Sequence, residues 1–265
     1  MQLNENEIRA LRYYEGDVKG EDPFWGDPKA YLTLNSLLYP GLRNEKARTA
    51  EGKKLNPAIL CHDRYPLLEL YEDLFAAVCK GTEDRERTVY RVERYSDYLE
   101  QKEAGKTLSF TSTSTAGYLK AYGDRVGIAL MKIVIPKGVP ALDFSKALSE
   151  YAKAEEKEIL LPPCAGIRIR EVPLREEEET ILDAQGNKPL VSALCTLEAP
   201  RFSFRESEEE LPDPSSGQRV YEALNRGEEP SKEDCKAYLA FKEILQKKLW
   251  CSFAKISETN KRNSL

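Results

Sequence analysis

The sequence predicts an α+β fold in which helices come first and strands follow. Apolar residues recur at helical spacing through residues 1–85, whereas residues 86–200 contain short runs rich in Val, Ile and Leu. A helical part followed by a strand-rich part, with no regular alternation of the two, is typical of α+β proteins with a mainly antiparallel sheet. The chain shows no internal repeat.

Several helices are expected in the first part. Asn4 precedes Glu7 by three residues, which is typical of a capping box at the start of a helix. Asp27 followed by Pro28 indicates the start of another helix, and Gly81 the end of a later one. The apolar stripes are Ile8, Leu11 and Tyr14; Tyr31, Leu34 and Leu38; and Leu67, Leu70, Tyr71 and Leu74. We expect these stripes to pack into the core.

The second part is read as strands because its apolar runs are short and rich in β-branched residues. The expected strands cover residues 88–92, 127–135, 158–161, 167–172, 180–182 and 190–197. The polar and glycine-containing residues 183–187 fit a hairpin turn between the last two strands.

The composition changes after Pro200. Residues 206–230 are rich in Glu, Pro and Ser, which favours a linker or an exposed loop. We expect an amphipathic helix over residues 231–253, with Ser231 as its cap and with lysines nearby. Its apolar face consists of Tyr238, Phe241, Leu245 and Leu249. Two alternatives stay open for residues 201–265, since the helix either completes the core or binds a regulatory partner.

Charge and composition exclude some classes of protein. The net charge is −5 and the sequence pI about 5.4, which argues against nucleic acid as a partner. No apolar run approaches the roughly 20 residues of a membrane helix, and the N-terminus does not resemble a signal peptide. We expect a cytoplasmic protein, or one secreted or injected into a target cell without a visible signal peptide.

The cysteines do not indicate a metal site. The six cysteines form no C-x-x-C pair, and His62 is the single histidine, so we expect no structural zinc. Cys61, His62 and Asp63 have the residue types of a nucleophilic site, but three adjacent residues seldom converge on one point. Free thiols in a reducing compartment are the preferred interpretation.

Three short motifs carry groups suited to one ligand. Arg91 follows a strand-like run, and arginine can bind phosphate with two parallel hydrogen bonds. Ser112-Thr113-Ser114 offers hydroxyls that can orient a carboxylate. Glu156 and Glu158 are two residues apart, and on an extended chain such residues point the same way.

Each motif also has an ordinary interpretation when taken alone. Arg91 could be a solvated side chain paired with Glu93, and the Ser-Thr-Ser run could be a cap for residues 116–122. The glutamates could belong to a charged surface. However, the run ends abruptly in the apolar residues 159–161, which favours an edge of the sheet.

Together, the motifs resemble the Arg–Ser-Thr-Ser–Glu-x-Glu signature of the arginine-type mono-ADP-ribosyltransferases. Arg91 and Ser112 are 21 residues apart, and Ser112 and Glu158 are 46 apart. The resemblance covers about residues 4–200, and the N-terminal segment is similar to the helical opening of bacterial toxin-type members. It implies a helical N-terminal region packed on a two-sheet, mainly antiparallel β core, with NAD in a cleft.

The resemblance also implies roles for single residues. Arg91 would contact the NAD phosphates, Ser112 would position the catalytic glutamate, and Glu158 would drive cleavage of the nicotinamide–ribose bond. Glu156 would select an arginine acceptor, in a recognition loop that contains Tyr151. The NAD-binding residues would be Arg91, Phe110, Ser112, Thr113, Ser114 and Glu158. Residues 116–125 would form a loop over the phosphates.

The sequence therefore predicts an NAD-dependent mono-ADP-ribosyltransferase that modifies arginine on a protein and needs no metal. Its catalytic domain would be residues 1–200, followed by a linker and helix over 201–265. The cleavage passes through a transition state like the oxocarbenium ion of glycoside cleavage, which a nearby carboxylate stabilises. Two alternatives remain: an NAD glycohydrolase that uses water as acceptor, and a catalytically degenerate binding module of the same fold.

Overall fold

The computed structural model describes residues 2–16, 30–61, 65–82, 84–115, 126–148, 157–173, 176, 188–202 and 209–263. They form an α+β protein, as the sequence predicts. The chain divides into two compact units. Unit 1 consists of residues 78–201 with the first two residues, and unit 2 consists of residues 3–77 and 202–265. The helix start at Asp27, the strand 180–182 and the turn 183–187 lie outside the described residues.

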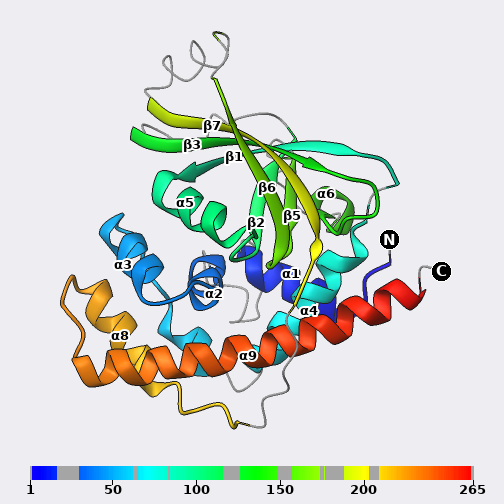
Figure 1. Ribbon diagram of the computed structural model, residues 1–265. Coiled ribbons are helices and arrows are strands. Elements are labelled where there is room, and N and C mark those ends of the chain that lie inside the picture. Colours follow the sequence, from blue (N-terminus) through cyan, green and yellow to red (C-terminus); the bar gives the residue numbers. More distant parts are fainter. Residues whose placement is uncertain are drawn as a thin grey trace. The chain divides into compact units, whose positions relative to one another are not determined.

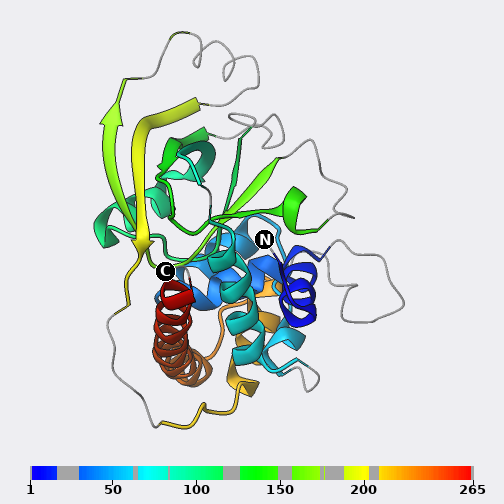
Figure 2. The ribbon, with the colours of Figure 1, turned by 90° about the vertical axis from the view of Figure 1, so that its right-hand side faces the viewer.

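Unit 1 is built on a mixed sheet whose strand order is β4-β5-β2-β1-β3-β7-β6 (Figure 1). The strands are β1 Arg87–Arg94, β2 Thr111–Ser114, β3 Val126–Ile135, β4 Leu142–Asp143, β5 Glu158–Leu161, β6 Ala165–Val172 and β7 Lys188–Pro200. The pairing of β3 with β7 is parallel, and the other neighbouring strands are antiparallel. β6 and β7 lie side by side at one edge (Figure 2). The expected strands within the described residues are thus confirmed.

Two separate sheets were expected, but the structure has a single hydrogen-bonded sheet. Few residue pairings join the two halves of this sheet. β1 pairs with β3 along its whole length, from Arg87 to Arg94. In contrast, β1 pairs with β2 at one position, Tyr90 opposite Ser114. The sequence predicts which residues are extended but not which strands pair, so this junction was not foreseen.

The core of unit 1 lies on one face of this sheet. Its buried residues include Val89, Ala129, Met131, Ile133, Ile159, Leu161, Ala193, Cys195 and Leu197. Helix α5 (Tyr95–Ala104) contacts β1, β3 and β6 and contributes the fully buried Tyr98. The Tyr98 hydroxyl donates to Glu171 Oε1 on β6 at 3.0 Å. A short helix, α6 (Phe144–Ala147), follows β4.

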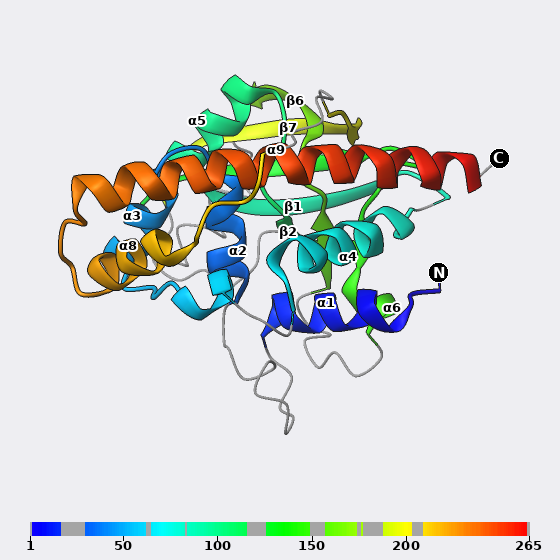
Figure 3. The ribbon, with the colours of Figure 1, turned by 90° about the horizontal axis from the view of Figure 1, so that it is seen from below.

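Unit 2 is helical (Figure 3). Its elements are α1 Glu5–Glu15, α2 Ala30–Leu38, α3 Arg43–Ala50, the 3₁₀ helix η1 Pro57–Cys61, α4 Leu67–Lys80, α8 Ser215–Asn225 and α9 Lys232–Asn263. The last three residues of α4 belong to unit 1. The predicted capping box is confirmed, because Glu7 N–H donates to Asn4 Oδ1 and Asn4 N–H to Glu7 Oε2, both at 2.8 Å.

The tail of the chain differs from the expectation in two ways. The segment expected to be a linker contains α8, which buries Val220 and Tyr221. Helix α9 continues to Asn263, past residue 253, where the helix was expected to end. The Glu/Pro/Ser composition hid α8 because its apolar residues are few and lie on one face.

The apolar face of α9 is buried, which supports its role as part of a core. Tyr238, Phe241, Leu245, Leu249 and Phe253 are at most 1% exposed, and α9 contacts α8 and α2. In the structure, the tail forms one compact unit with residues 3–77. Among the described residues, no helix is both long and apolar enough to cross a membrane.

Candidate active site

Arg91 lies on β1 and reaches across to β2. Its Nη1 donates to the main-chain oxygen of Ser112 at 2.6 Å, and its Nε donates to Glu93 Oε2 at 2.6 Å. The side chains of Arg91 and Glu93 are 16% and 5% exposed. The pairing with Glu93 therefore exists, as the ordinary interpretation of Arg91 supposed, but the pair is largely buried and connects two strands.

The Ser-Thr-Ser run is β2 itself, and it pairs with β5. Ser112 lies opposite Leu160, and Ser114 lies opposite Glu158. Because directly opposite residues of an antiparallel pair face the same side, Ser112, Ser114 and Glu158 share one face of the β2–β5 pair. Ile159 and Leu161 face the other way, into the core of unit 1.

The opposite side of β2 is anchored. Thr113 Oγ1 donates to the main-chain oxygen of Ile159 at 2.7 Å, and Thr113 is 3% exposed. Phe110, directly before β2, is 1% exposed. This anchoring fixes which way the serines point, because side chains alternate along a strand.

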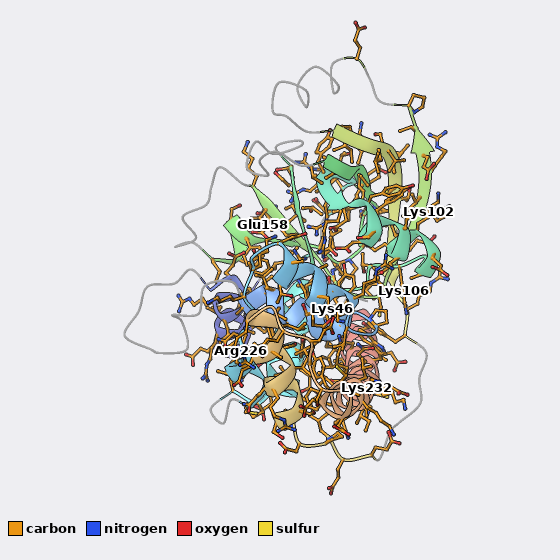
Figure 4. The ribbon with its side chains drawn as sticks, turned by 90° about the vertical axis from the view of Figure 1, so that its left-hand side faces the viewer. Lys46, Lys102, Lys106, Glu158, Arg226 and Lys232 are labelled. Atoms are coloured by element: carbon orange, nitrogen blue, oxygen red, sulfur yellow. The ribbon has the colours of Figure 1, made fainter. Side chains whose placement is uncertain are left out.

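Glu158 is the first residue of β5 and is 6% exposed (Figure 4). The structure thus places this carboxylate at the start of a strand, on the same face as the two serine side chains. Three of the sequence-predicted site residues, Arg91, Ser112 and Glu158, thus lie on three strands that are consecutive in the sheet.

One argument about the glutamates is corrected by the structure. Lys157 has φ of 45°, in the left-handed region that residues other than glycine seldom adopt. The chain between Glu156 and Glu158 is therefore not extended, and the two carboxylates cannot be assumed to share a face by strand alternation. Glu156 itself and Tyr151 lie outside the described residues, as do residues 116–125.

An ion pair and a turn lie beside the β2–β5 pair. Arg87 Nη1 binds Asp143 Oδ2 at 3.0 Å, and Asp143 pairs with Ile159. Burial alone would raise the pKa of Asp143, but hydrogen bonds from Ser145 and Arg87 outweigh it and lower the pKa. After β5, Cys164 has φ of 57°, and burial raises the pKa of its thiol to about 11, so the thiol is not a nucleophile at neutral pH.

No group of three or more His, Cys, Asp or Glu side chains is placed to hold a metal ion in the described parts of the chain. The described side chains of the site supply a guanidinium, hydroxyls and a carboxylate. These groups can bind an anion, orient a sugar hydroxyl and stabilise a developing cation.

No protein-family model and no curated protein sequence matches the chain. Among solved structures, it is similar to BECa, an ADP-ribosylating toxin of a binary enterotoxin of C. perfringens, solved with NADH (17% identity, 74% of this chain, 44% of that chain, TM-score 0.46). It is also similar to C3stau2 from S. aureus, solved with NAD (16%, 75% and 89%, TM-score 0.45). A third is Plx2a, an ADP-ribosyltransferase toxin from Paenibacillus larvae (14%, 74% and 88%, TM-score 0.41).

Two of these three are ADP-ribosylating toxins by name. The chain spans less than half of the length of the C. perfringens toxin. Because the identities are 17% or less and the TM-scores are below 0.5, the roles of single residues rest on the geometry of this chain.

The burial of Glu93 was not predicted from the sequence. This residue was considered as a surface partner of Arg91, whereas in the structure it is 4% exposed. A signal for it existed, since Arg91 and Glu93 are two residues apart on a strand and therefore share a face.

Proposed function

We propose that the protein is an NAD-dependent mono-ADP-ribosyltransferase that transfers ADP-ribose to arginine on a protein and releases nicotinamide. One observation supports this most. Arg91, Ser112 and Glu158 come from three separate motifs, yet lie on consecutive strands, with Arg91 Nη1 2.6 Å from the Ser112 oxygen and Glu158 opposite Ser114.

In the proposed reaction, the bond between ribose C1′ and the nicotinamide nitrogen breaks, and its electron pair leaves with nicotinamide. A guanidino nitrogen of the acceptor then bonds to C1′ and loses a proton. Glu158 would stabilise the ribose cation and accept a hydrogen bond from a ribose hydroxyl. Ser112 would orient Glu158, and Arg91 would bind the phosphates of NAD.

The choice of arginine as acceptor rests on Glu156, the first glutamate of the motif. In the proposed role, Glu156 holds the incoming guanidinium and accepts its proton. This part of the proposal draws on the family resemblance and on residue identity.

The decisive experiment compares Glu158→Gln with the wild type in NAD cleavage and in transfer to agmatine, a small guanidino compound. The variant keeps the size of the side chain but removes the charge, and the loss of one such group costs about 10²–10³-fold. Glu171→Gln is the matched control, because Glu171 lies on β6 and pairs with Lys102. Wild-type rates in Glu158→Gln would contradict the assignment.

Glu156→Ala separates transfer from cleavage. Transfer to agmatine should collapse while slow release of nicotinamide persists. Equal loss of both activities would remove the special acceptor role of Glu156. If the wild type released nicotinamide at a rate that no acceptor increases, the protein would be an NAD glycohydrolase. Binding of NAD without any turnover would instead indicate a degenerate binding module.

A further inference from the structure

Glu93 is a buried carboxylate with both oxygens engaged. Oε2 accepts a hydrogen bond from Arg91 Nε at 2.6 Å, and Oε1 accepts one from the main-chain N–H of Arg94 at 3.2 Å. The side chain of Arg94 forms a separate ion pair, since its Nε and Nη2 donate to Asp97 Oδ2 at 2.9 and 2.6 Å. Glu93 is therefore a fixed acceptor and not a mobile counter-charge.

Arg91 is fixed by this acceptor on one side and by the main chain of β2 on another. The two bonds, from Nε to Glu93 and from Nη1 to Ser112, start from different nitrogens of one planar group. Two such bonds define the plane of the guanidinium as well as its position. They use two of the five N–H donors that a guanidinium carries.

A carboxylate beside an anion-binding arginine is unfavourable if charge alone decides affinity. At an effective dielectric constant of about 20, two unit charges 4 Å apart interact by about 4 kcal/mol, so Glu93 weakens the attraction of the site for phosphate. Arginine, however, binds phosphate through the planar geometry of its donors, and less is lost when that geometry is set in advance. Glu93 therefore lowers the electrostatic attraction of the site for phosphate but fixes the orientation of the Arg91 guanidinium.

We infer that Glu93 is a positioning residue that holds the guanidinium of Arg91 in the plane needed to bind the phosphates of NAD. The inference rests on the proposed function, because it requires Arg91 to contact NAD. It predicts that Glu93 acts on NAD binding through Arg91 and does not act on bond cleavage at Glu158.

A double-mutant cycle tests this prediction. The dissociation constant for NAD is measured by calorimetry for the wild type, Glu93→Ala, Arg91→Ala and the double variant. We expect Glu93→Ala to raise the constant about tenfold in the wild type, which corresponds to roughly 1.4 kcal/mol. In the Arg91→Ala background the same change should have almost no effect, because the group that Glu93 positions is gone. At saturating NAD, nicotinamide release by Glu93→Ala should stay within about twofold of the wild type.

Two further variants separate positioning from stability. Asp97→Asn weakens a neighbouring ion pair of similar exposure, 7% for Asp97 against 5% for Glu93, and should lower the melting temperature without changing NAD affinity. Glu93→Gln keeps the side-chain size but has one acceptor oxygen for two donors, so its affinity should lie between those of the wild type and Glu93→Ala. This variant decides the matter if Glu93→Ala does not fold.

The outcomes distinguish the inference from the function on which it rests. Unchanged or tighter NAD binding in folded Glu93→Gln, or an equal effect of Glu93→Ala in both backgrounds, overturns the positioning role while the transferase proposal stands. A wild type that neither binds nor cleaves NAD overturns both. A change in the maximal rate with unaltered affinity also overturns the inference, because it would place Glu93 in the cleavage step.

Discussion

Each of the two units contains a buried ion pair, and the two pairs are built differently. In unit 1, Arg91 and Glu93 are 16% and 5% exposed, and both residues lie on one strand. In unit 2, Lys242 of α9 and Glu45 of α3 are 3% and 0% exposed, and the pair joins segments 197 residues apart in sequence. Because Arg91 remains partly exposed and Lys242 is almost fully buried, we call the first pair open and the second enclosed.

The difference lies in how the cations are used. Lys242 has three N–H donors, and its Nζ contacts the main-chain oxygens of Ser36 and Gly41 at 2.7 and 2.8 Å as well as Glu45. Tyr238 also donates to Glu45, at 3.0 Å. Burial raises the pKa of Glu45 and lowers that of Lys242, and the attraction between them opposes both shifts. The Lys242 pair holds helices together, and the Arg91 pair orients a group that still reaches the surface.

Breaking the enclosed pair should have the largest effect on stability. Lys242→Ala leaves Glu45 charged and buried without its cation. We expect this loss to lower the free energy of unfolding by about 3–5 kcal/mol. Urea denaturation followed by tryptophan fluorescence measures the loss, since Trp250 lies on α9 with its ring 5.8 Å from that of Phe253. Replacing both partners, with Lys242→Met and Glu45→Gln, should recover much of it. A double variant as unstable as Lys242→Ala would contradict the role of the unpaired charge.

Gly217 tests the packing around the same network. A Cβ atom at Gly217 would lie 2.8 Å from Tyr238 Cδ2 and 2.9 Å from Leu60 Cδ1. Gly217→Ala should therefore destabilise unit 2 by about 1–3 kcal/mol, measured in the same denaturation experiment. The matched control is Ser216→Ala, because the buried Ser216 hydroxyl has no hydrogen-bond partner among the described residues and its removal should be neutral or stabilising. Equal losses in both variants would argue against the close contact with Tyr238.

Arg91→Lys examines the open pair at constant charge. Lysine keeps the positive charge but lacks the planar donors that contact Glu93 and Ser112 and that are proposed to bind phosphate. We expect NAD affinity to fall about tenfold, or roughly 1.4 kcal/mol, with little change in turnover at saturating NAD. Calorimetry and nicotinamide release, measured in parallel, check this. A reduced maximal rate with unchanged affinity would be inconsistent with a role in phosphate binding.

A third pair, Arg87 with Asp143, is the most exposed of the three, at 18% and 13%, and gives the smallest expected effect. The pKa of Asp143 is lowered in the folded state, so the pair contributes stability above the unfolded pKa of about 3.9. That contribution is lost as the pH falls through the lower folded pKa. Asp143→Asn should cost about 0.5–1 kcal/mol at pH 7, and the difference from the wild type should disappear in acid. A difference that is constant from pH 7 to pH 2 would show that charge is not its cause.

Local patterns in the sequence were sufficient for most helices and strands among the described residues. Residues Glu158–Leu161, a glutamate followed by three apolar residues, form a strand with the predicted bounds. The capping box at Asn4 is also formed. Arg91, Ser112 and Glu158 lie on strands, as the sequence predicts, because strand patterns depend on neighbours in sequence. Their roles in a site remain part of the proposal.

Features that depend on distant residues were not predicted. The parallel pairing of β3 with β7 and the narrow contact between β1 and β2 are set by the whole sheet. Lys242 was counted among the basic residues beside the apolar face of α9, but Glu45, 197 residues earlier, allows it to be buried. The left-handed conformation of Lys157 also has no signal in the sequence, because glycine is the residue that normally marks it.

The order of the segments along the chain has a consequence for synthesis of the protein. Unit 2 is made from both sides of unit 1 in the sequence, so α3 leaves the ribosome long before α9. At about 5–20 residues per second, the 197 residues between Glu45 and Lys242 take roughly 10–40 s to translate. During that time the first helices of unit 2 have neither Lys242 nor the apolar face of α9 to pack against. Residues 78–201 are complete before α9 is synthesised. The sheet-containing unit can therefore fold on the ribosome first, and release of the finished chain completes the helical one.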